Sequence, residues 1–474
     1  MCVCVNKIIR DRVMFKVTVN GNFYTAESGA LLSVVLSENG IWVEHPCGGK
    51  GLCKKCRVKV NGRDELCCAY KINSDITVEI PVQEKEAREE GVDTSVPNES
   101  LCLCLDIGTT TLELALVDRK NKEILKTFKA VNPQTAMGAD VISRIAYATE
   151  NGTAALQKCV VNKMNELISQ MGVEAVKKMY VSANTTMLHI LFGEDCTSLG
   201  VAPYTPKFLS SKMADAKGLG IEGVKEVESL PCIDTFVGAD IVAGVYFAGE
   251  PAKGKYNLLV DLGTNTEIVL WSEQGGVCTS AASGPCFEGG NISCGMRATK
   301  GAVCGFSEGS MAVIGNTIPK GLCASGLIDV VAHLIKKGKI DSTGYMAEDF
   351  SIAYGVSLTG EDVREYQVAK SAVYSGIQTL VNELKISFAD IDKAYICGGF
   401  SQGLNIKNAV FTGLIPKELQ EKCVLLGNSS LSGTVKYALG NGLSEKLLKK
   451  SKYIDLAEHP FFAGAFIKNM EVFS

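Results

Sequence analysis

Cysteines gather near the N-terminal end of the chain, where Cys47, Cys53 and Cys56 are followed closely by Cys67 and Cys68. The first three lie on a loop with the sequence Cys-Gly-Gly-Lys-Gly-Leu-Cys-Lys-Lys-Cys. Thiolates at such short spacing are the ligands that an iron–sulfur cluster requires. The glycines allow the loop to wrap closely around a cluster and to direct backbone N–H groups at its sulfides. This segment therefore predicts an iron–sulfur site.

The spacing of these cysteines resembles that of [2Fe–2S] ferredoxins. Five residues separate Cys47 from Cys53, which is the looser spacing of adrenodoxin-like ferredoxins. The fourth ligand is Cys67 or Cys68. In ferredoxins the last ligand precedes an Asp and a final strand, which favours Cys68, seven residues before Asp75. The resemblance thus implies these metal ligands: Cys47, Cys53, Cys56 and Cys68. A structural zinc site is the alternative, because the loop contains one Cys-X-X-Cys pair, half of a zinc knuckle.

Two Gly/Thr turns, each introduced by an aspartate, recur in the longer remainder of the chain. They are Asp106-Ile-Gly-Thr-Thr-Thr and, about 155 residues later, Asp261-Leu-Gly-Thr-Asn-Thr, and each lies between two strand-like segments. Amides and hydroxyls of such turns can hold phosphate oxygens, and the aspartate can bind Mg²⁺ through water. The repetition predicts a duplicated, two-lobed α/β domain.

Two later glycine motifs extend the pattern. Ser325 and Gly326 lead into a helix whose N-terminus can face phosphate or ribose, and Gly398-Gly399-Phe400 follows a predicted strand. In this order and spacing the motifs resemble the ATP site of the superfamily of sugar kinases, heat-shock protein 70 and actin. The resemblance implies that Asp106 and Asp261 are catalytic, with Mg²⁺. It implies ATP contacts from Gly108, Thr109, Thr110, Gly263, Thr264, Asn265, Ser325, Gly326, Gly398, Gly399 and Phe400.

The elements that must position the cysteines are predicted from local patterns. Residues 15–24 alternate between apolar and polar and contain Asn20-Gly21, the pattern of a β-hairpin, and 30–38 have helical spacing. Together with later strand-like segments they predict an α+β, β-grasp ferredoxin domain over 14–83. Residues 1–13 precede it as a leader.

The remainder of the chain follows a polar, acidic stretch at residues 84–100, which has the composition of a flexible linker. From residue 101 strands and helices alternate, the pattern of an α/β fold. We therefore expect a two-lobed, actin-like ATPase domain over 101–474. Its lobes are predicted at about 101–255 and 256–474.

Composition excludes several function classes. The 474-residue chain is 46% hydrophobic and 21% charged, and no stretch approaches the roughly 18 apolar residues that a membrane span needs. It has no recognisable signal peptide, so we expect a cytoplasmic protein without a membrane partner. A formal charge of −4 argues against nucleic acid as the partner. Isolated cysteines, such as Cys159, Cys278, Cys323 and Cys397, are expected to be buried thiols rather than disulfides.

Three further stretches point to one family: 283–297, 184–189 and Gly427-Asn-Ser-Ser-Leu-Ser-Gly. With the ferredoxin unit, they make the chain resemble the reductive activators of corrinoid proteins. The resemblance implies ATP-dependent reduction of inactive Co(II) to Co(I), with a [2Fe–2S] cluster supplying one electron. It implies a corrinoid protein as acceptor, a low-potential ferredoxin or flavoprotein as donor, and a homodimer. Longer members carry a middle domain; because Pro97 leads almost directly to Asp106, we expect that domain to be absent here.

Two other functions remain open at this point. One is an activator of another low-potential enzyme, such as a 2-hydroxyacyl-CoA dehydratase, although the fused ferredoxin unit argues against it. The other is a small-molecule kinase with a redox-sensing domain, which would need a catalytic base in a recognisable kinase motif. His189 is either a cobalt ligand or a histidine packed on a helix, and helix packing is the interpretation favoured.

Overall fold

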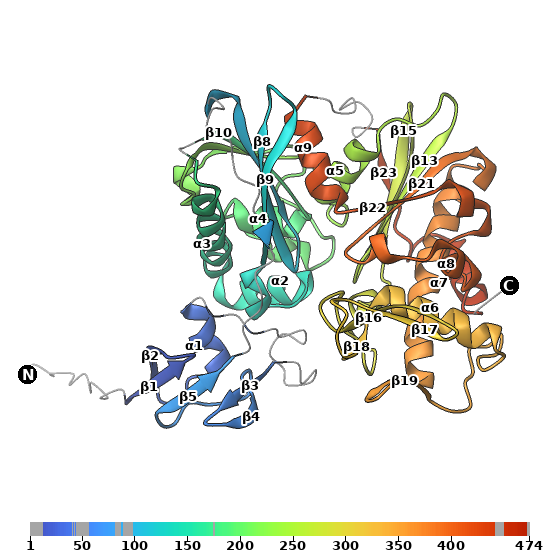
Figure 1. Cartoon of the computed structure of the whole chain (residues 1–474). Helices are drawn as coiled ribbons and strands as arrows, with labels where there is room; N and C mark the ends of the chain where they lie inside the picture. Colours follow the sequence, from blue (N-terminus) through green and yellow to red (C-terminus); the bar gives the residue numbers. More distant parts are fainter. Residues whose placement is uncertain are drawn as a thin grey trace, which may run out of the picture.

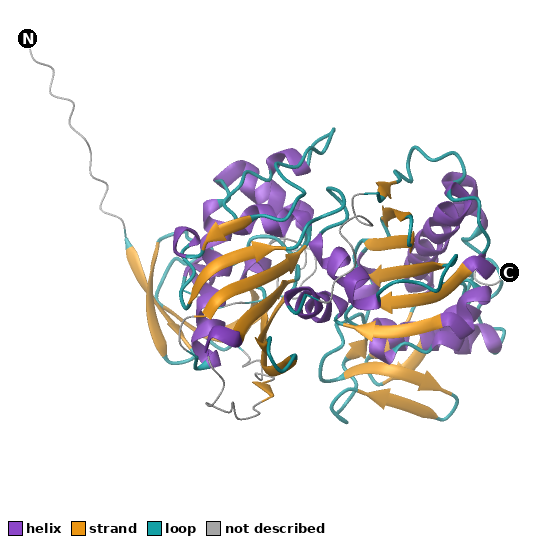
Figure 2. Ribbon diagram, turned by 90° about the horizontal axis from the view of Figure 1, so that it is seen from above, coloured by secondary structure: helices purple, strands orange, loops and turns teal. Residues whose placement is uncertain are grey.

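The computed structural model describes residues 13–39, 41, 43, 56–80, 87–88, 98–173, 176–440 and 450–471. The described residues form one small and two large bodies (Figure 1). The small body and the second large body each have a buried apolar core, and the core of the first large body continues across the boundary onto the second sheet. The small body contains the N-terminal strands and lies beneath the first large body. The two large bodies stand side by side, each with a sheet flanked by helices (Figure 2).

The small body is a mixed five-stranded sheet with one helix. Asn20 and Gly21 close the predicted hairpin and both have positive φ, 47° and 88°. Turns of this kind match the right-handed twist of the two strands that they connect. β1 pairs with β5 in parallel, and α1 buries Leu32 and Leu36 in the same core. This confirms the β-grasp prediction. In sheet order the strands are β2 (Asn22–Glu27), β1 (Met14–Val19), β5 (Ile76–Glu79), β3 (Arg57–Val60) and β4 (Arg63–Leu66), and the helix is α1 (Leu32–Glu38).

The first large body is built on a seven-stranded sheet with β7 near its centre. β7, β8 and β9 form an antiparallel meander, and β10 and β12 join β7 in parallel. In sheet order the strands are β11 (Met213–Asp215), β12 (Val224–Ser229), β10 (Val176–Ala183), β7 (Leu101–Ile107), β8 (Thr111–Asp118), β9 (Glu123–Val131) and β6 (Ala87–Arg88). The helices are α2 (Val141–Asn151), α3 (Ala154–Met171), α4 (Thr185–Leu191) and α5 (Ala239–Ala248).

The second large body repeats this strand order. The order β12-β10-β7-β8-β9 of the first sheet recurs as β22-β21-β13-β14-β15, which confirms the predicted duplication. Its strands are β22 (Cys423–Gly427), β21 (Ile391–Cys397), β13 (Tyr256–Leu262), β14 (Thr266–Ser272), β15 (Gly275–Ala281) and β23 (Lys452–Tyr453). Its helices are α6 (Ala324–Lys336), α7 (Gly360–Glu383), α8 (Ile406–Phe411), α9 (Ser429–Ala438) and α11 (Phe462–Lys468).

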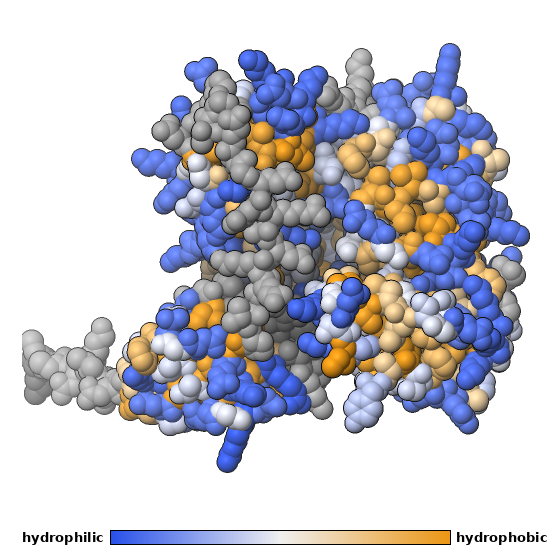
Figure 3. Space-filling view, in the orientation of Figure 1, coloured by the Kyte–Doolittle hydropathy of each residue, from blue (hydrophilic) through white to orange (hydrophobic). Residues whose placement is uncertain are grey.

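Two small sheets extend the lower edge of the second body. They are β17 (Ser310–Val313), β16 (Ala302–Ser307) and β18 (Gly321–Leu322), and the pair β19 (Phe350–Ala353) and β20 (Val356–Leu358). In the space-filling view apolar atoms gather over this layer and over the face of the second body (Figure 3). Among the exposed apolar side chains of this layer, Ile318 is 79% exposed.

Helices α5 and α9 lie against each other between the two large sheets (Figure 1). α5 follows the last strand of the first sheet, and α9 follows β22 of the second sheet. Gly433 of α9 allows the close approach, since a Cβ there would lie 1.8 Å from the carbonyl oxygen of Ala243. Each half of the molecule therefore contributes one helix to the boundary between the two halves.

The interior also contains the isolated cysteines. Cys278 and Cys397 are 0% exposed, and Cys159 is 8% exposed, as the sequence predicted. Burial raises the pKa of the Cys159 thiol to about 12, which keeps it protonated and unreactive. Among the described residues no helix combines the length and apolarity that crossing a membrane requires.

Candidate functional site

The first Gly/Thr turn joins β7 to β8, and hydrogen bonds to its backbone carbonyl groups hold it in place. Asn132 donates from Nδ2 to the carbonyl of Gly108 at 2.8 Å and from its backbone N–H to the carbonyl of Thr110 at 2.7 Å. Gly108 is required here, because a Cβ would lie 2.9 Å from the carbonyl oxygen of Thr111. The N–H of Gly108 is donated to the carbonyl of Thr111 at 2.9 Å, so partly exposed Thr109 and Thr110 are the residues whose amides and hydroxyls suit an anionic ligand.

A buried arginine supports the same turn. The guanidinium of Arg144, on α2, donates to the carbonyl of Thr109, to the carbonyl of Gly138 at 2.9 Å and to Gln134 Oε1 at 3.2 Å. Arg144 is 0% exposed, and burial lowers its pKa to about 9. α2 starts beside it through a capping box between Asp140 and Ser143. The Gly138-Ala-Asp segment thus holds Arg144 in position, and Arg144 in turn holds the first Gly/Thr turn.

The second Gly/Thr turn joins β13 to β14. Between its paired Asp and Glu residues it is one residue shorter than the first turn. Asp261 pairs with Glu267 across this hairpin, whereas Asp106 pairs with Glu113 across the first. Ser283 donates to the carbonyl of Gly263 at 3.2 Å. The N–H of Thr264 donates to Glu288 Oε1 at 3.3 Å, so a carboxylate of the 283–297 segment lies at an amide of this turn.

Carboxyl groups from both halves converge between the two turns. Burial raises the pKa of Asp106, Asp240 and Asp261 to about 7 each, and neighbouring carboxylates of the group add to the shift. Burial, with Asp240 and Asp261 nearby, also raises the pKa of Glu267 well above its usual value. These groups interact electrostatically across the boundary, so the structure brings Asp106 and Asp261 together from sequence positions far apart.

The converging carboxyls are a suitable environment for a hydrated cation. Within the described part of the chain, no three acidic, histidine or cysteine side chains lie close enough to bind one metal ion directly. Mg²⁺ commonly keeps several water ligands and is held through them, so this spacing fits an indirect site. A divalent cation would also relieve the mutual repulsion of the buried carboxylates.

Ser325 and Gly326 lie at the start of α6 and face the protein interior. Ser325 is 2% exposed and donates to the carbonyl of Cys304 at 2.8 Å. A Cβ at Gly326 would lie 2.1 Å from the carbonyl oxygen of Val303. Both residues therefore seat α6 against β16.

The glycine pair at 398–399 lies at the end of β21, directly beside the second hairpin. Gly398 has φ of 106°, and a Cβ there would lie 2.3 Å from the carbonyl oxygen of Leu262, so glycine is required. Gly399 faces open space. Phe400 is buried and stacks on Phe287 with ring centroids 5.7 Å apart, which places it in the core. Ser401 has a buried Oγ without a hydrogen-bond partner, a group that a bound ligand would satisfy.

The cysteine site is described in part. Cys56 and Cys68 are buried, and their sulfur atoms lie 3.2 Å apart. Cys67 is buried beside them, and burial, followed by the neighbouring Cys56, raises the pKa of its thiol far above the usual value. Cys47 and Cys53 lie outside the described residues. The adjacent, buried sulfurs of Cys56 and Cys68 fit part of the thiolate donor set of an iron–sulfur cluster.

His189 is a packed histidine, as favoured from the sequence. Its Nδ1 lies 2.7 Å from the carbonyl of Thr185, and its Nε2 accepts from the N–H of Lys207 at 2.9 Å. The ring stacks on Phe208 with centroids 4.5 Å apart. Both ring nitrogens are thus engaged within the fold.

Sequence reasoning missed five residues of this site. They are Arg144, Asp240, Glu267, Asn428 and Ser430, and the last two donate hydrogen bonds to Asp106. A signal was present for most of them. The segments Gly138-Ala-Asp and Gly238-Ala-Asp echo each other, and the 427–433 stretch stood out by its serines and glycines.

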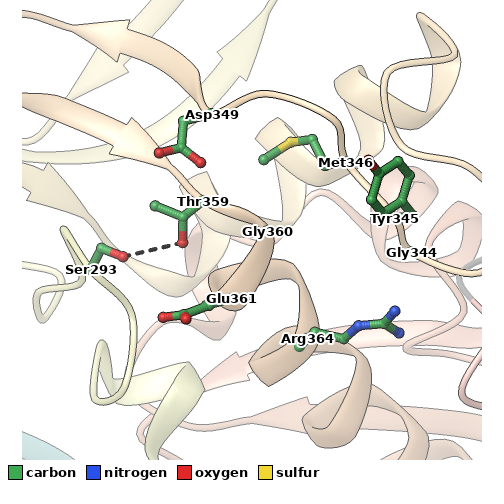
Figure 4. Close-up of a pocket in the computed structure, with 9 residues that line it drawn as sticks. All are labelled: Ser293, Gly344, Tyr345, Met346, Asp349, Thr359, Gly360, Glu361 and Arg364. Atoms are coloured by element: carbon green, nitrogen blue, oxygen red, sulfur yellow. Dashed lines mark hydrogen bonds between the residues drawn. The ribbon is translucent and has the colours of Figure 1, made fainter.

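A separate pocket lies at the N-terminal end of α7 (Figure 4). It has a volume of about 550 Å³ and is lined by polar side chains that include Glu361 and Arg364. Ser293 Oγ and Thr359 Oγ1 lie 3.3 Å apart at its wall. None of the nucleotide contacts predicted from sequence lines this pocket.

Comparison with known proteins gives matches over most of the chain. Residues 17–95 match the model of the 2Fe-2S iron-sulfur cluster binding domain. Residues 101–250 match the RACo middle region, and 255–474 match the C-terminal domain of RACo, the ASKHA domain.

Similar whole proteins act on corrinoids according to their names. The chain is 31% identical to the corrinoid activation enzyme RamQ of Eubacterium limosum over 82% of this chain and 71% of that protein. It is 24% identical to the [Co(II) methylated amine-specific corrinoid protein] reductase of Methanosarcina barkeri, over 75% and 71% of the two chains. Its fold matches the solved structure of the reductive activator for corrinoid, iron-sulfur protein with a TM-score of 0.69 and 26% sequence identity. The match covers 97% of this chain and 98% of that chain.

These matches correct one expectation. The family's middle region is present, at residues 101–250, and the prediction of a short form without it is wrong. The physical reason is that this region begins with β7 and therefore contains Asp106 itself. The short distance from Pro97 to Asp106 consequently says nothing about a missing segment.

Proposed function

Because this chain belongs to the family of reductive activators of corrinoid proteins, we propose that it returns the cobalt of a corrinoid protein from Co(II) to Co(I) in an ATP-dependent reaction. A [2Fe–2S] cluster, when bound, supplies one electron at a time, which balances this one-electron reduction. The observation that carries the proposal is the convergence of Asp106 and Asp261 from two duplicated hairpins, in a chain that also has buried, adjacent cysteines.

The cysteines are proposed as the cluster ligands. Cys56 and Cys68 are already adjacent and buried, and Cys47 and Cys53 complete the set predicted from the sequence. The β-grasp sheet supports this role, because β3 starts directly after Cys56 and holds the last loop cysteine in place. Burial excludes water from the thiolates and so protects a cluster from hydrolysis.

The two Gly/Thr turns are proposed as the phosphate-binding hairpins. In the first, Asn132 and Arg144 hold the carbonyls back, so that amides and hydroxyls of Thr109 and Thr110 can bind phosphate oxygens. In the second, Gly263, Thr264 and Asn265 take the same role, and the carboxylate of Glu288 has to leave the Thr264 amide when phosphate arrives.

Carboxylates between the turns are proposed to hold Mg²⁺ through water. Asp106 and Asp261 lie on opposite hairpins, and Asp240 lies within electrostatic reach of both. The adenosine end is proposed to lie at Gly398 and Gly399, where the backbone is open and the hydroxyl of Ser401 needs a partner. Ser325, Gly326 and Phe400 then act indirectly, because their contacts shape the walls of this end of the site.

ATP can drive the electron transfer only if the nucleotide states differ in their affinity for the corrinoid protein or for one conformation of the complex. The boundary between the two large bodies, where both hairpins meet, is where the nucleotide would act. We further propose a low-potential ferredoxin or flavoprotein as the electron donor, a homodimer, and a cytoplasmic location.

The test is the reduction of a Co(II) corrinoid protein under anaerobic conditions, followed by its visible spectrum. With a chemical donor, wild type should form Co(I) only with Mg²⁺ and ATP. Asp261→Asn should lose ATP hydrolysis and Co(I) formation while the cluster spectrum and the iron and sulfide content stay intact. Equal reduction with and without ATP contradicts the coupling, and a wild-type protein without cluster bands contradicts the iron–sulfur site.

A further inference from the structure

The N-terminal end of α9 reaches from one half of the molecule to the catalytic aspartate of the other. The chain leaves the second sheet at the end of β22, and Asn428 caps α9 by accepting from the N–H of Leu431 at 3.0 Å. α9 then packs on β7, β8 and β10 of the first sheet rather than on its own. Its first turn therefore lies beside Asp106.

Both oxygens of the Asp106 carboxylate accept hydrogen bonds from this turn. Asn428 Nδ2 donates to Asp106 Oδ2 at 3.0 Å, and Ser430 Oγ donates to Asp106 Oδ1 at 2.8 Å. Asn428 Nδ2 also lies 2.7 Å from Glu113 Oε2, the residue opposite Asp106 in the hairpin. One amide group thus bridges the two carboxylates of the first hairpin.

The donors are themselves held in place. Ser430 Oγ lies 2.8 Å from Ser182 Oγ, and Thr434 donates to the same Ser182 hydroxyl at 2.7 Å. Ser182 and Thr434 are 0% exposed, and Ser430 is 7% exposed. This buried hydroxyl chain joins α9 to β10, so the position of Ser430 is set by the first sheet.

We propose that Asn428 and Ser430 are positioning residues, which orient the Asp106 carboxylate for the hydrated Mg²⁺ of ATP from the opposite half of the protein. The inference rests on the proposed ATP site. Neither residue contacts the nucleotide or the metal in this arrangement. They act through Asp106, and they make the geometry of the first phosphate hairpin depend on where α9 lies.

The charges around Asp106 explain why such donors are needed. Glu113 on β8, Asp240 on α5 and Asp261 on β13 are all acidic neighbours. A lysine on this side, Lys129, lies 4.0 Å from Glu113. Carboxylates repel one another at this range, so an untethered Asp106 side chain would rotate away from the others. Two neutral donors keep it in place without adding a positive charge that would compete with Mg²⁺.

Asn428→Asp separates this role from helix capping. An aspartate still accepts from the N–H of Leu431 and is as good a cap as asparagine, but it has no N–H to give Asp106 or Glu113. Ser430→Ala removes the second donor, and Ser430→Thr restores it. Ser432→Ala is the matched control on the same helix, because Ser432 Oγ donates only to the backbone carbonyl of Asn428.

The measurement is steady-state ATP hydrolysis by the full chain, with thermal unfolding as the check on folding. Asn428→Asp and Ser430→Ala should each lower kcat by about tenfold to a hundredfold with the KM for ATP within about twofold, the pattern of misplaced catalytic geometry. Ser430→Thr should recover most of kcat, and Ser432→Ala should equal wild type.

Several outcomes overturn the inference. A kcat within about twofold of wild type for both variants does so, as does a raised KM at unchanged kcat, which would indicate direct ATP contact. The proposed function fails in a different way: wild type then hydrolyses no ATP, or Asp106→Asn and Asp261→Asn keep full activity, and the inference falls with it.

Discussion

Cys67 and Cys68 are the two candidates for the fourth ligand of the cluster. Cys68 has its sulfur 3.2 Å from that of Cys56. The backbone of Cys67 is anchored at both ends, with its N–H donated to the carbonyl of Cys56 and its carbonyl accepting from Ser33 of α1. Asp75, which set the register for Cys68, accepts from the N–H of Lys16 at 2.8 Å and so joins β5 to β1. The Cys67 thiol also interacts with Cys56, so Cys68 as the fourth ligand stays a prediction.

We expect Cys68→Ser to lose the cluster and Cys67→Ser to retain it. Serine replaces the thiolate ligand by a poor one in the first case, whereas in the second it replaces a buried neighbour of similar size. Iron and sulfide content and the visible spectrum after anaerobic purification measure the difference. The reverse result, with the cluster lost in Cys67→Ser alone, would make Cys67 the ligand.

At the scale of elements, the packing of α9 on α5 determines how the two halves meet. Gly433 lies where the helices are closest, with room for hydrogen but not for a methyl group. An alanine inside a helix normally stabilises it by roughly 0.5–1 kcal/mol relative to glycine. At this position the clash with the carbonyl of Ala243 has to outweigh that gain.

Gly433→Ala should therefore destabilise the protein by about 1–3 kcal/mol and also lower ATP hydrolysis, because α9 carries the donors to Asp106. The matched control is Gly464→Ala in α11, where an added Cβ meets nothing within 4 Å. Urea unfolding compares the two. A Gly433→Ala protein as stable and active as the control would show that the helices can separate without cost.

Lys370 ties α7 to the C-terminal segment through a buried amine. Its Nζ donates to the carbonyl of Glu471, and Gln367 of the same helix donates to the carbonyl of Met470 at 2.7 Å. Lys370 is 2% exposed, and burial lowers its pKa to about 8 against the opposing effect of Glu471. The charged amine therefore destabilises the folded state at neutral pH.

The sign of the pH dependence follows from this shift. Below pH 8 the amine is protonated in both states; between about pH 8 and 10.5 the folded state releases the proton while the unfolded state keeps it, so folding stability gains. The free energy of unfolding of wild type, relative to Lys370→Met, should rise by roughly 3 kcal/mol across this window. Urea titrations at several pH values measure it, and a constant difference between the two proteins would contradict the buried charge.

At the scale of the whole molecule, the separate core of the ferredoxin unit predicts a separate response to perturbation. The ferredoxin unit is small and so buries a smaller fraction of its surface than the large bodies do. A bound cluster would then contribute much of its folding free energy. One large core continues across the boundary between the two large bodies, and the second body has a further core of its own, so a nucleotide at the boundary would stabilise both bodies.

Calorimetry should resolve a low-temperature transition of the ferredoxin unit that Cys56→Ser lowers or abolishes. The transition temperature of the large bodies should be the same in this variant as in wild type, and Mg²⁺ with ATP should raise it. The Cys56→Ser protein should still hydrolyse ATP. The control is Asp261→Asn, which should remove hydrolysis without moving the first transition. A single transition that shifts as one in both variants would show that the cores unfold together.

Local patterns determined most of what the sequence could predict. The Asn20-Gly21 turn, the Asp-X-Gly-Thr hairpins and the periodicity of the helices each depend on residues close together in the chain, where backbone sterics and side-chain spacing decide the outcome. Duplication was visible because both copies keep the same short motif. The family's middle region escaped prediction, because its first strand is the hairpin strand that was assigned to the ATPase.

Tertiary structure decided which side chains share one site. Asp106, Asp240 and Asp261 repel one another only because two sheets and α5 bring them within electrostatic range, and no local pattern shows that. Asn428 and Ser430 reach Asp106 across 322 and 324 residues of sequence, through a helix that packs on the opposite half. The sequence by itself determined the chemistry that is available here, because residue types and turns are local. Only the packing of α9 and α5 between the sheets decided where that chemistry meets, because burial and charge act through space rather than along the chain.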